Sequence, residues 1–111
     1  MRQHTSTEQT NKLIELGMPS PKYILDAWAH ETDIDVEYEY ECAYSIGELI
    51  NILPKIHPSY HDPYCIDIGF DTIKWIVGYT YNNGYVEVKS SYELIDALYD
   101  MVITLKEDGD L

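Results

Sequence analysis

The sequence predicts an α+β fold in which three helices pack on one face of an antiparallel sheet of about five strands. Its 111 residues and 45% hydrophobic content suit one domain with a single core between two layers. Helical and strand patterns follow one another in the order α-β-β-α-β-β-β-α. The connections between strand-like segments are as short as those of hairpins, which favours antiparallel pairing over parallel crossovers. We therefore expect a single domain over residues 1–111, with residues 1–5 and 107–111 frayed.

Each predicted helix begins with a capping box, in which a hydroxyl residue is followed three positions later by Glu or Gln. These boxes are Thr5–Glu8 (overlapping Ser6–Gln9), Ser45–Glu48 and Ser90–Glu93. The apolar residues after each box recur at helical spacing, which indicates amphipathic helices over about 6–16, 45–53 and 91–106. The three helices are thus predicted from both their start signals and their periodicity.

The clearest strand covers residues 33–42, where acidic and apolar side chains alternate strictly with the period of a half-buried strand. Further strand-like segments cover 22–30, 64–70, 73–81 and 85–88. Asn82-Asn83-Gly84 predicts a tight turn between the last two. Gly69 and Gly78 fall inside strands, where glycine more often indicates a bulge or a close backbone approach than a cofactor loop.

The charge balance is the strongest compositional signal. Twenty Asp and Glu residues against seven Lys and Arg residues give a formal net charge of -13. Phosphate groups repel such a chain, and its seven cations are scattered singly rather than clustered. Direct binding to nucleic acid or to an anionic membrane is therefore disfavoured. Eleven tyrosines and two tryptophans indicate that the acidic residues stand on a folded scaffold, because disordered acidic chains are poor in aromatic residues.

The sequence also indicates the cellular compartment in which the protein is expected. No apolar stretch approaches the roughly 18 to 20 residues that cross a bilayer. The first residues lack the apolar core of a secretion signal, so we expect a cytoplasmic protein. In that compartment Cys42 and Cys65 are expected to remain reduced thiols.

Three stretches resemble segments of small uncharacterised acidic proteins encoded by gut bacteria, their phages and mobile elements. They are Ser6–Gly17, Tyr44–Ile50 and Glu93–Tyr99. The resemblance covers about a third of the chain, almost entirely in predicted helices, and implies no known activity. It does imply a class of role, since short accessory proteins of phages and mobile elements often bind and block a host protein.

Five carboxylates fall on one face of the strand predicted at 33–42: Asp33, Asp35, Glu37, Glu39 and Glu41. Successive acids on one strand face stand about 6.6 to 6.8 Å apart, twice the rise per residue. This spacing is of the same order as the separation of phosphates along a nucleic-acid strand, so the row of acids suits a basic groove that normally holds DNA or RNA. Tyr38 and Tyr40 alternate with the acids, and tyrosines beyond the needs of a small core are good interface residues.

A plainer interpretation of the same strand is a solvated face whose acids serve only solubility. It explains polarity well but uniform sign poorly, because mixed charges would avoid repulsion and because Asp and Glu are unfavourable in strands. Both interpretations remain open at this level.

A second group of residues allows a metal-binding alternative. His57, His61 and Cys65 recur at intervals of four, and two imidazoles with a thiolate are a plausible zinc set. Pro58 and Pro63 make this segment a loop, and the spacing is not one of the paired-cysteine zinc patterns. We therefore expect no cofactor, with zinc at these three residues as the alternative.

The sequence contains no recognisable nucleophile elbow, phosphate-binding loop or kinase-type motif. These observations favour a non-enzymatic, protein-binding module whose acidic strand engages a basic surface on a host protein, such as a nuclease or another nucleic-acid-binding defence protein. The alternatives are a housekeeping interaction or assembly domain with a merely solvated acidic face, and the zinc-binding protein described above.

Overall fold

The computed structural model describes residues 1–60 and 63–111. In chain order the elements are α1 (Thr7–Glu15), β1 (Tyr23–Glu31), β2 (Val36–Ala43), α2 (Ile46–Ile52), β3 (Cys65–Asp71), β4 (Lys74–Tyr81), β5 (Gly84–Ser91) and α3 (Leu94–Glu107). Every strand pairing is antiparallel. The predicted α+β class and the order α-β-β-α-β-β-β-α are therefore confirmed.

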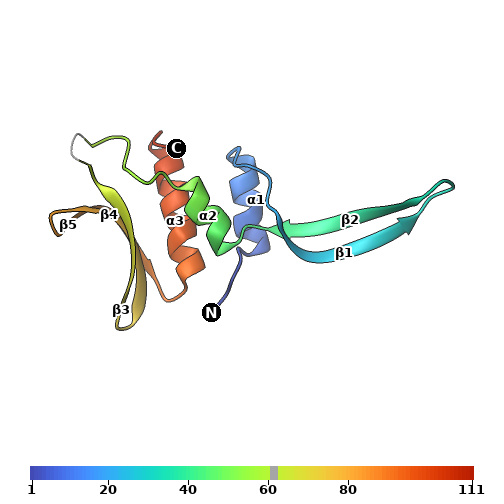
Figure 1. Cartoon of the computed structure of the whole chain (residues 1–111), viewed down its shortest axis with the longest axis horizontal. Coiled ribbons are helices and arrows are strands. Elements are labelled where there is room, and N and C mark those ends of the chain that lie inside the picture. The colour runs from blue at the N-terminus through green and yellow to red at the C-terminus, as the bar shows by residue number, and fades with distance from the viewer. Residues whose placement is uncertain (61–62) are drawn as a thin grey trace.

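The five strands divide between two sheets instead of forming one. Strands β3, β4 and β5 form a three-stranded meander, whereas β1 and β2 form a separate two-stranded sheet. Figure 1 shows the meander at one end, the three helices side by side in the middle, and the β1–β2 hairpin extending from the other end. The molecule is consequently elongated, with principal extents of 62 × 30 × 18 Å.

The core lies between α3 and the inner face of the meander, with α1 and α2 completing it. Apolar residues of α3 that recur every three or four positions are fully buried, as the amphipathic pattern predicts. Val77 and Tyr79 project into this core from β4, Leu13 from α1 and Leu49 from α2. Each such side chain contributes about 1.5 to 3 kcal/mol by leaving water.

The predicted capping boxes form at the first two helices and not at the third. The Ser6 side chain accepts from the Gln9 N–H, and Gln9 in turn accepts from the Ser6 N–H. Ser45 and Glu48 do the same at α2. At α3 the prediction was wrong: strand β5 continues to Ser91, and the N-cap residue Glu93 makes no capping hydrogen bond through its side chain.

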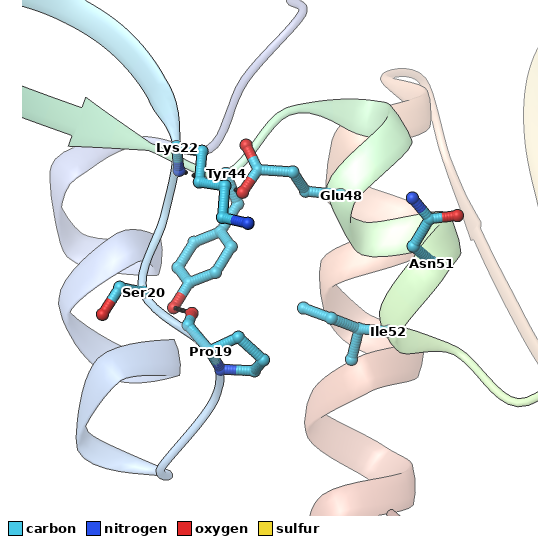
Figure 2. A pocket seen from close by; sticks show the side chains of 7 residues that line it. All are labelled: Pro19, Ser20, Lys22, Tyr44, Glu48, Asn51 and Ile52. Atoms are coloured by element: carbon cyan, nitrogen blue, oxygen red, sulfur yellow. Dashed lines mark hydrogen bonds between the residues drawn. The ribbon is translucent and has the colours of Figure 1, made fainter.

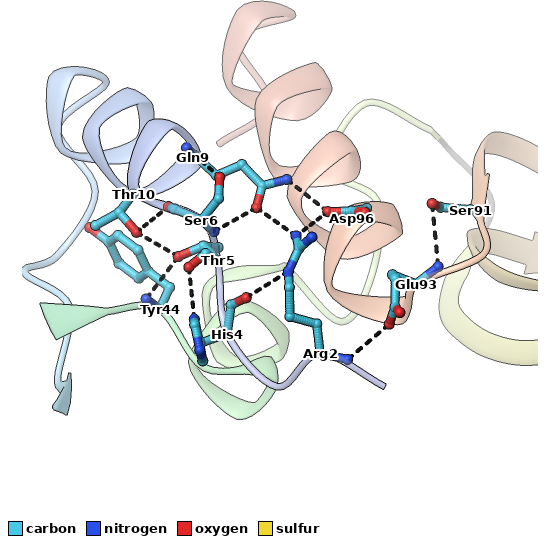
Figure 3. A network of polar contacts seen from close by, with 10 residues as sticks. All are labelled: Arg2, His4, Thr5, Ser6, Gln9, Thr10, Tyr44, Ser91, Glu93 and Asp96. Atoms are coloured by element: carbon cyan, nitrogen blue, oxygen red, sulfur yellow. Dashed lines mark hydrogen bonds and ion pairs between the residues drawn. The ribbon is translucent and has the colours of Figure 1, made fainter. Parts of the chain in front are cut away.

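Residues near both ends of the chain, where fraying was expected, make hydrogen bonds to other parts of the molecule. Thr5 is buried and exchanges two hydrogen bonds with the Tyr44 backbone. The Arg2 guanidinium lies 2.5 Å from the Asp96 carboxylate and donates to the Gln9 side-chain oxygen at 3.0 Å (Figure 3). At the other end, α3 continues through Glu107, and the Asp110 side chain accepts from the Ser59 hydroxyl.

Among the described residues, none of the helices is both long enough and apolar enough to cross a membrane.

Candidate protein-binding arm

The β1–β2 hairpin projects from the helices as an arm, defined here as residues 23–43 (Figure 1). All nine residues of β1 are exposed, and β2 becomes buried only at its last residues, Cys42 and Ala43. The pairing shifts between Ile24 and Asp26, which makes Leu25 the extra residue of a β-bulge near the base of the arm. Both faces of the arm are therefore open to solvent along most of its length.

The pairing register assigns each side chain to one of two faces, because directly opposed residues of an antiparallel pair point to the same side. The first face, called the acidic face, combines three residues of each strand: Glu37 with His30, Glu39 with Trp28, and Glu41 with Asp26. The second, called the tyrosine face, places Tyr38 opposite Ala29 and Tyr40 opposite Ala27. The predicted separation of acids from tyrosines is thus found in the structure.

The acidic face carries three of the five predicted carboxylates. Strand β2 begins at Val36, so Asp33 and Asp35 belong to the loop at the tip and do not continue the row, which corrects the predicted strand 33–42. The Asp35 carboxylate accepts the Val36 N–H at 2.7 Å, and the Asp35 N–H donates to the Thr32 hydroxyl at 3.0 Å. This loop geometry fixes the tip while leaving its acids exposed.

Charge on the arm has one sign. Residues 23–43 contain seven carboxylates and no Lys or Arg, so the arm accounts for more than half of the net charge of -13. One internal partner exists, since His30 Nε2 lies 3.0 Å from Glu39 Oε2. A protonated His30 offsets only one of these charges. The arm is therefore a concentrated source of negative potential on a narrow support.

The tyrosine face is exposed and mostly apolar, with Glu31 as its one carboxylate, and the prediction that this strand is half-buried was wrong. Tyr38 and Tyr40 expose 62% and 53% of their surface. Their rings stack with centroids 6.5 Å apart and an angle of 23° between planes. The alanines opposite them leave the rings standing clear of the neighbouring strand. Large apolar side chains that no part of the chain covers are typical of an interaction surface.

The base of the arm is fixed to the helices by contacts that the sequence did not predict, although the Ser45–Glu48 capping box takes part in them. The Lys22 N–H donates to Glu48 Oε2 at 3.0 Å, while the other oxygen of Glu48 accepts from the Ser45 N–H. The Tyr44 hydroxyl donates to the Pro19 carbonyl at 2.5 Å. Burial raises the pKa of the Tyr44 hydroxyl, and the nearby Glu48 carboxylate raises it further. These contacts set the direction in which the arm leaves the body.

A shallow cleft of about 270 Å³ lies beside this base (Figure 2). It is lined by Pro19, Ser20 and Lys22 from the segment before β1, by Tyr44, and by Glu48, Asn51 and Ile52 of α2. Lys22 lies far from Tyr44 and Glu48 in the sequence. Nothing in their spacing predicts that they meet.

His57 and Cys65 of the alternative zinc set do not converge. The Ile56–Cys65 bridge places those two residues on one side of the local pairing, so His57 points to the opposite side. Its ring is only 1% exposed, lies edge-on against Tyr79, and accepts the Ser59 N–H at Nδ1. Cys65 is exposed and its thiol faces the Pro63 carbonyl. His61 falls outside the described residues.

The other ring nitrogen of His57 faces the end of the chain. Its Nε2 lies 3.8 Å from Asp110 Oδ2, beyond hydrogen-bond distance, and has no partner among the described residues. Within residues 1–60 and 63–111 no three His, Cys, Asp or Glu side chains cluster as a metal site would require.

No protein-family model matches this sequence, and comparison with curated proteins and with solved structures gives no significant match.

Proposed function

We propose that this chain is a non-enzymatic, acidic protein-binding module whose arm engages a basic surface on another protein. The observation that carries the proposal is the arm itself: an exposed hairpin with seven carboxylates and no Lys or Arg. A hairpin of two strands is at best marginally stable alone in water, so its extension away from the body needs a reason beyond folding. Recognition of a partner supplies that reason.

The negative charge of the arm favours a basic protein as its partner. Seven carboxylates repel phosphate and anionic lipid, and they attract Lys and Arg over a distance of about 8 to 10 Å at physiological salt. Such attraction raises association rates and selects for partners of opposite charge. Proteins that bind nucleic acid carry basic surfaces of this kind.

Mimicry of nucleic acid is the specific form that we propose. Glu37, Glu39 and Glu41 repeat along one strand face at about 6.6 to 6.8 Å, which is of the order of the phosphate spacing. The tip acids Asp33 and Asp35 extend the negative charge beyond the strand. In this proposal the arm occupies a groove of a host nuclease or another defence protein and inhibits it, as an accessory protein of a phage or mobile element would.

Replacing Glu37, Glu39 and Glu41 together with Gln tests the proposal, because shape and polarity are retained while three charges are lost. Each exposed ion pair contributes about 0.2 to 1 kcal/mol, so we expect the loss of three pairs to weaken partner binding by about threefold to 150-fold. The salt dependence of binding is expected to decrease as well. The measurement is elution of captured proteins from immobilised wild type and variant in a salt gradient.

A matched control changes the net charge equally at another place. Glu15, Glu107 and Asp108 are exposed carboxylates on the body, and their replacement with Gln, Gln and Asn removes three charges without touching the arm. Asp96 does not suit this purpose because it pairs with Arg2. Equal loss of binding in both triple variants would show that net charge alone is responsible, and the acidic face would then serve only solubility.

A further inference from the structure

The proposed function uses the acidic face of the arm and leaves the tyrosine face unexplained. That second face contains Ile24, Ala27, Ala29, Val36, Tyr38 and Tyr40, with Cys42 at the base of the arm and Glu31, opposite Val36, near its tip. Six of these side chains are apolar or aromatic and exposed to solvent, and the rings of Tyr38 and Tyr40 are the largest of them. The two faces belong to the same two strands, so any partner that grips the arm by one face leaves the other within reach.

The surface area that the arm can bury indicates whether a partner contacts one face of the arm or both faces. Eight residues of strand at 3.3 Å each and two strands at 4.8 Å give a flat area of about 250 Å² per face. Two arms joined by their tyrosine faces would bury about 500 Å² in total, or about 1,000 Å² if side-chain relief doubles the surface. Both values lie below the roughly 1,200 to 2,000 Å² of a stable specific interface. An arm enclosed on both faces buries twice as much, about 1,000 to 2,000 Å², and reaches that range once side-chain relief is included.

Charge argues in the same direction. A second copy of this chain would bring seven more carboxylates beside the first seven, and the remainder of the chain is also acidic. All seven Lys and Arg residues belong to the body, where thirteen carboxylates outnumber them, so the body of a second copy presents a net negative charge to the arm. The occupant that fits both faces is therefore a different protein with a basic groove.

We infer that the arm is inserted between the two walls of a groove in a basic protein, and this inference rests on the proposed function. One wall carries Lys or Arg side chains that pair with Glu37, Glu39 and Glu41. The opposite wall is apolar or carries the flat faces of Arg side chains, which pack against the rings of Tyr38 and Tyr40. The contacts of Glu48 and Tyr44 at the base hold the arm in one direction before binding, which lowers the entropy lost on insertion.

Photo-crosslinking from each face tests the inference in the full chain. p-Benzoyl-phenylalanine replaces Trp28 on the acidic face, Tyr38 on the tyrosine face, or Tyr92 as a control, a body residue that is 70% exposed. Each substitution exchanges one exposed aromatic side chain for another, and a thermal melt verifies folding. The expected result is that positions 28 and 38 capture the same protein, at two separate segments of it, of which the one captured from position 28 is rich in Lys and Arg, while position 92 does not capture it.

The other outcomes are distinguishable. Capture from position 28 alone would overturn insertion into a groove while leaving the proposed function intact. A crosslinked dimer of this chain from position 38 would overturn it too, by showing that the tyrosine face binds a second copy. Failure of both arm positions to capture any protein would overturn the inference and the proposed function together.

A second measurement separates the contributions of the two walls. Replacing Tyr38 and Tyr40 with Ser is expected to weaken binding of the protein captured at positions 28 and 38 about tenfold, with an unchanged salt dependence, because the tyrosines contribute no charge. The triple Gln variant of the acidic face is expected to lower both affinity and salt dependence. Unchanged affinity in the Tyr-to-Ser variant would overturn the inference.

Discussion

Tyr85 lies across the backbone of Gly78 on the outer face of the meander, and its hydroxyl donates to Asp67 Oδ2 at 3.0 Å. A Cβ atom built at Gly78 would stand 2.6 Å from Val88 Cγ2 and 2.8 Å from Tyr85 Cδ1. The hydrogen bond to Asp67 is the largest cause that raises the pKa of Tyr85. Desolvation of the hydroxyl and the negative charge of Asp67 raise this pKa further. One glycine thus makes room for a cross-strand contact that spans all three strands.

Gly78→Ala is therefore expected to destabilise the protein. The added methyl group displaces Tyr85 and Val88 from their positions, and overpacking of this kind costs about 1 to 3 kcal/mol. Gly69→Ala is the matched control, because a Cβ there meets no atom within 4 Å. Chemical denaturation of both variants measures the difference. Equal stability of the two variants would show that Tyr85 moves aside without cost.

For these two glycines the sequence predicted the same local structure, and the structure shows it at only one of them. Their positions inside strands predicted a bulge or a close approach, and Gly78 shows both, since the register of β4 and β5 shifts beside it. Gly69 shows neither crowding nor a shifted register. The sequence does not separate the two, because the crowding at Gly78 depends on which residues of the neighbouring strand lie opposite.

At the scale of elements, local signals predicted the helices and the strands but not what covers them. Capping boxes and apolar periodicity depend on residues three or four apart, and both are readable directly from the chain. An alternating strand pattern indicates only that the two faces of the strand differ in polarity. For β2 it could not show that neither face is covered, which depends on the distant packing of α3 against β4 and β5. The single predicted sheet and the half-buried strand both failed for this reason.

Helix α3 carries a carboxylate whose ionisation opposes folding. Burial raises the pKa of Asp100 above its ordinary value of 3.8, the neighbouring Asp96 raises it further, and Lys89 lowers it. A native carboxyl with a raised pKa binds protons more readily than the unfolded chain does. Its contribution to stability is therefore fully present below pH 3.8 and is lost as pH rises through the raised value.

Asp100→Asn is expected to abolish the loss of folding stability that ionisation of Asp100 causes at higher pH. Relative to wild type, the variant gains stability between about pH 3.5 and pH 7, because the amide stays neutral throughout. Because Asp100 is only partly buried, solvent screens the effect and we expect a gain below about 0.5 kcal/mol. Thermal melts of both proteins at the two pH values provide the measurement. If the stability difference between the variant and wild type is the same at both pH values, a raised pKa of Asp100 does not account for it.

At the scale of the whole molecule, folding and recognition are assigned to different parts. The core joins α1, α2 and α3 to the meander, and the arm contributes to burial only at its base. The sequence predicted the chemistry of the arm, namely acids on one side and tyrosines on the other. It did not predict that the arm projects, because projection follows from the absence of a covering layer, and no local pattern encodes that.

This division predicts that the body folds without the arm. Replacing residues 25–41 with Asn-Gly joins Ile24 to Cys42 through a two-residue turn of the kind that antiparallel pairs favour. The shortened chain keeps the stack of His4 on Tyr23, the hydrogen bond from Lys22 to Glu48, and the buried Tyr44. We expect its melting temperature to lie within about 5 °C of wild type, since a change near 1 kcal/mol shifts a domain of this size by about 4 to 8 °C. Capture of the partner is expected to be lost. A shortened chain that fails to fold would show that the arm stabilises the body, and one that still binds would place recognition elsewhere.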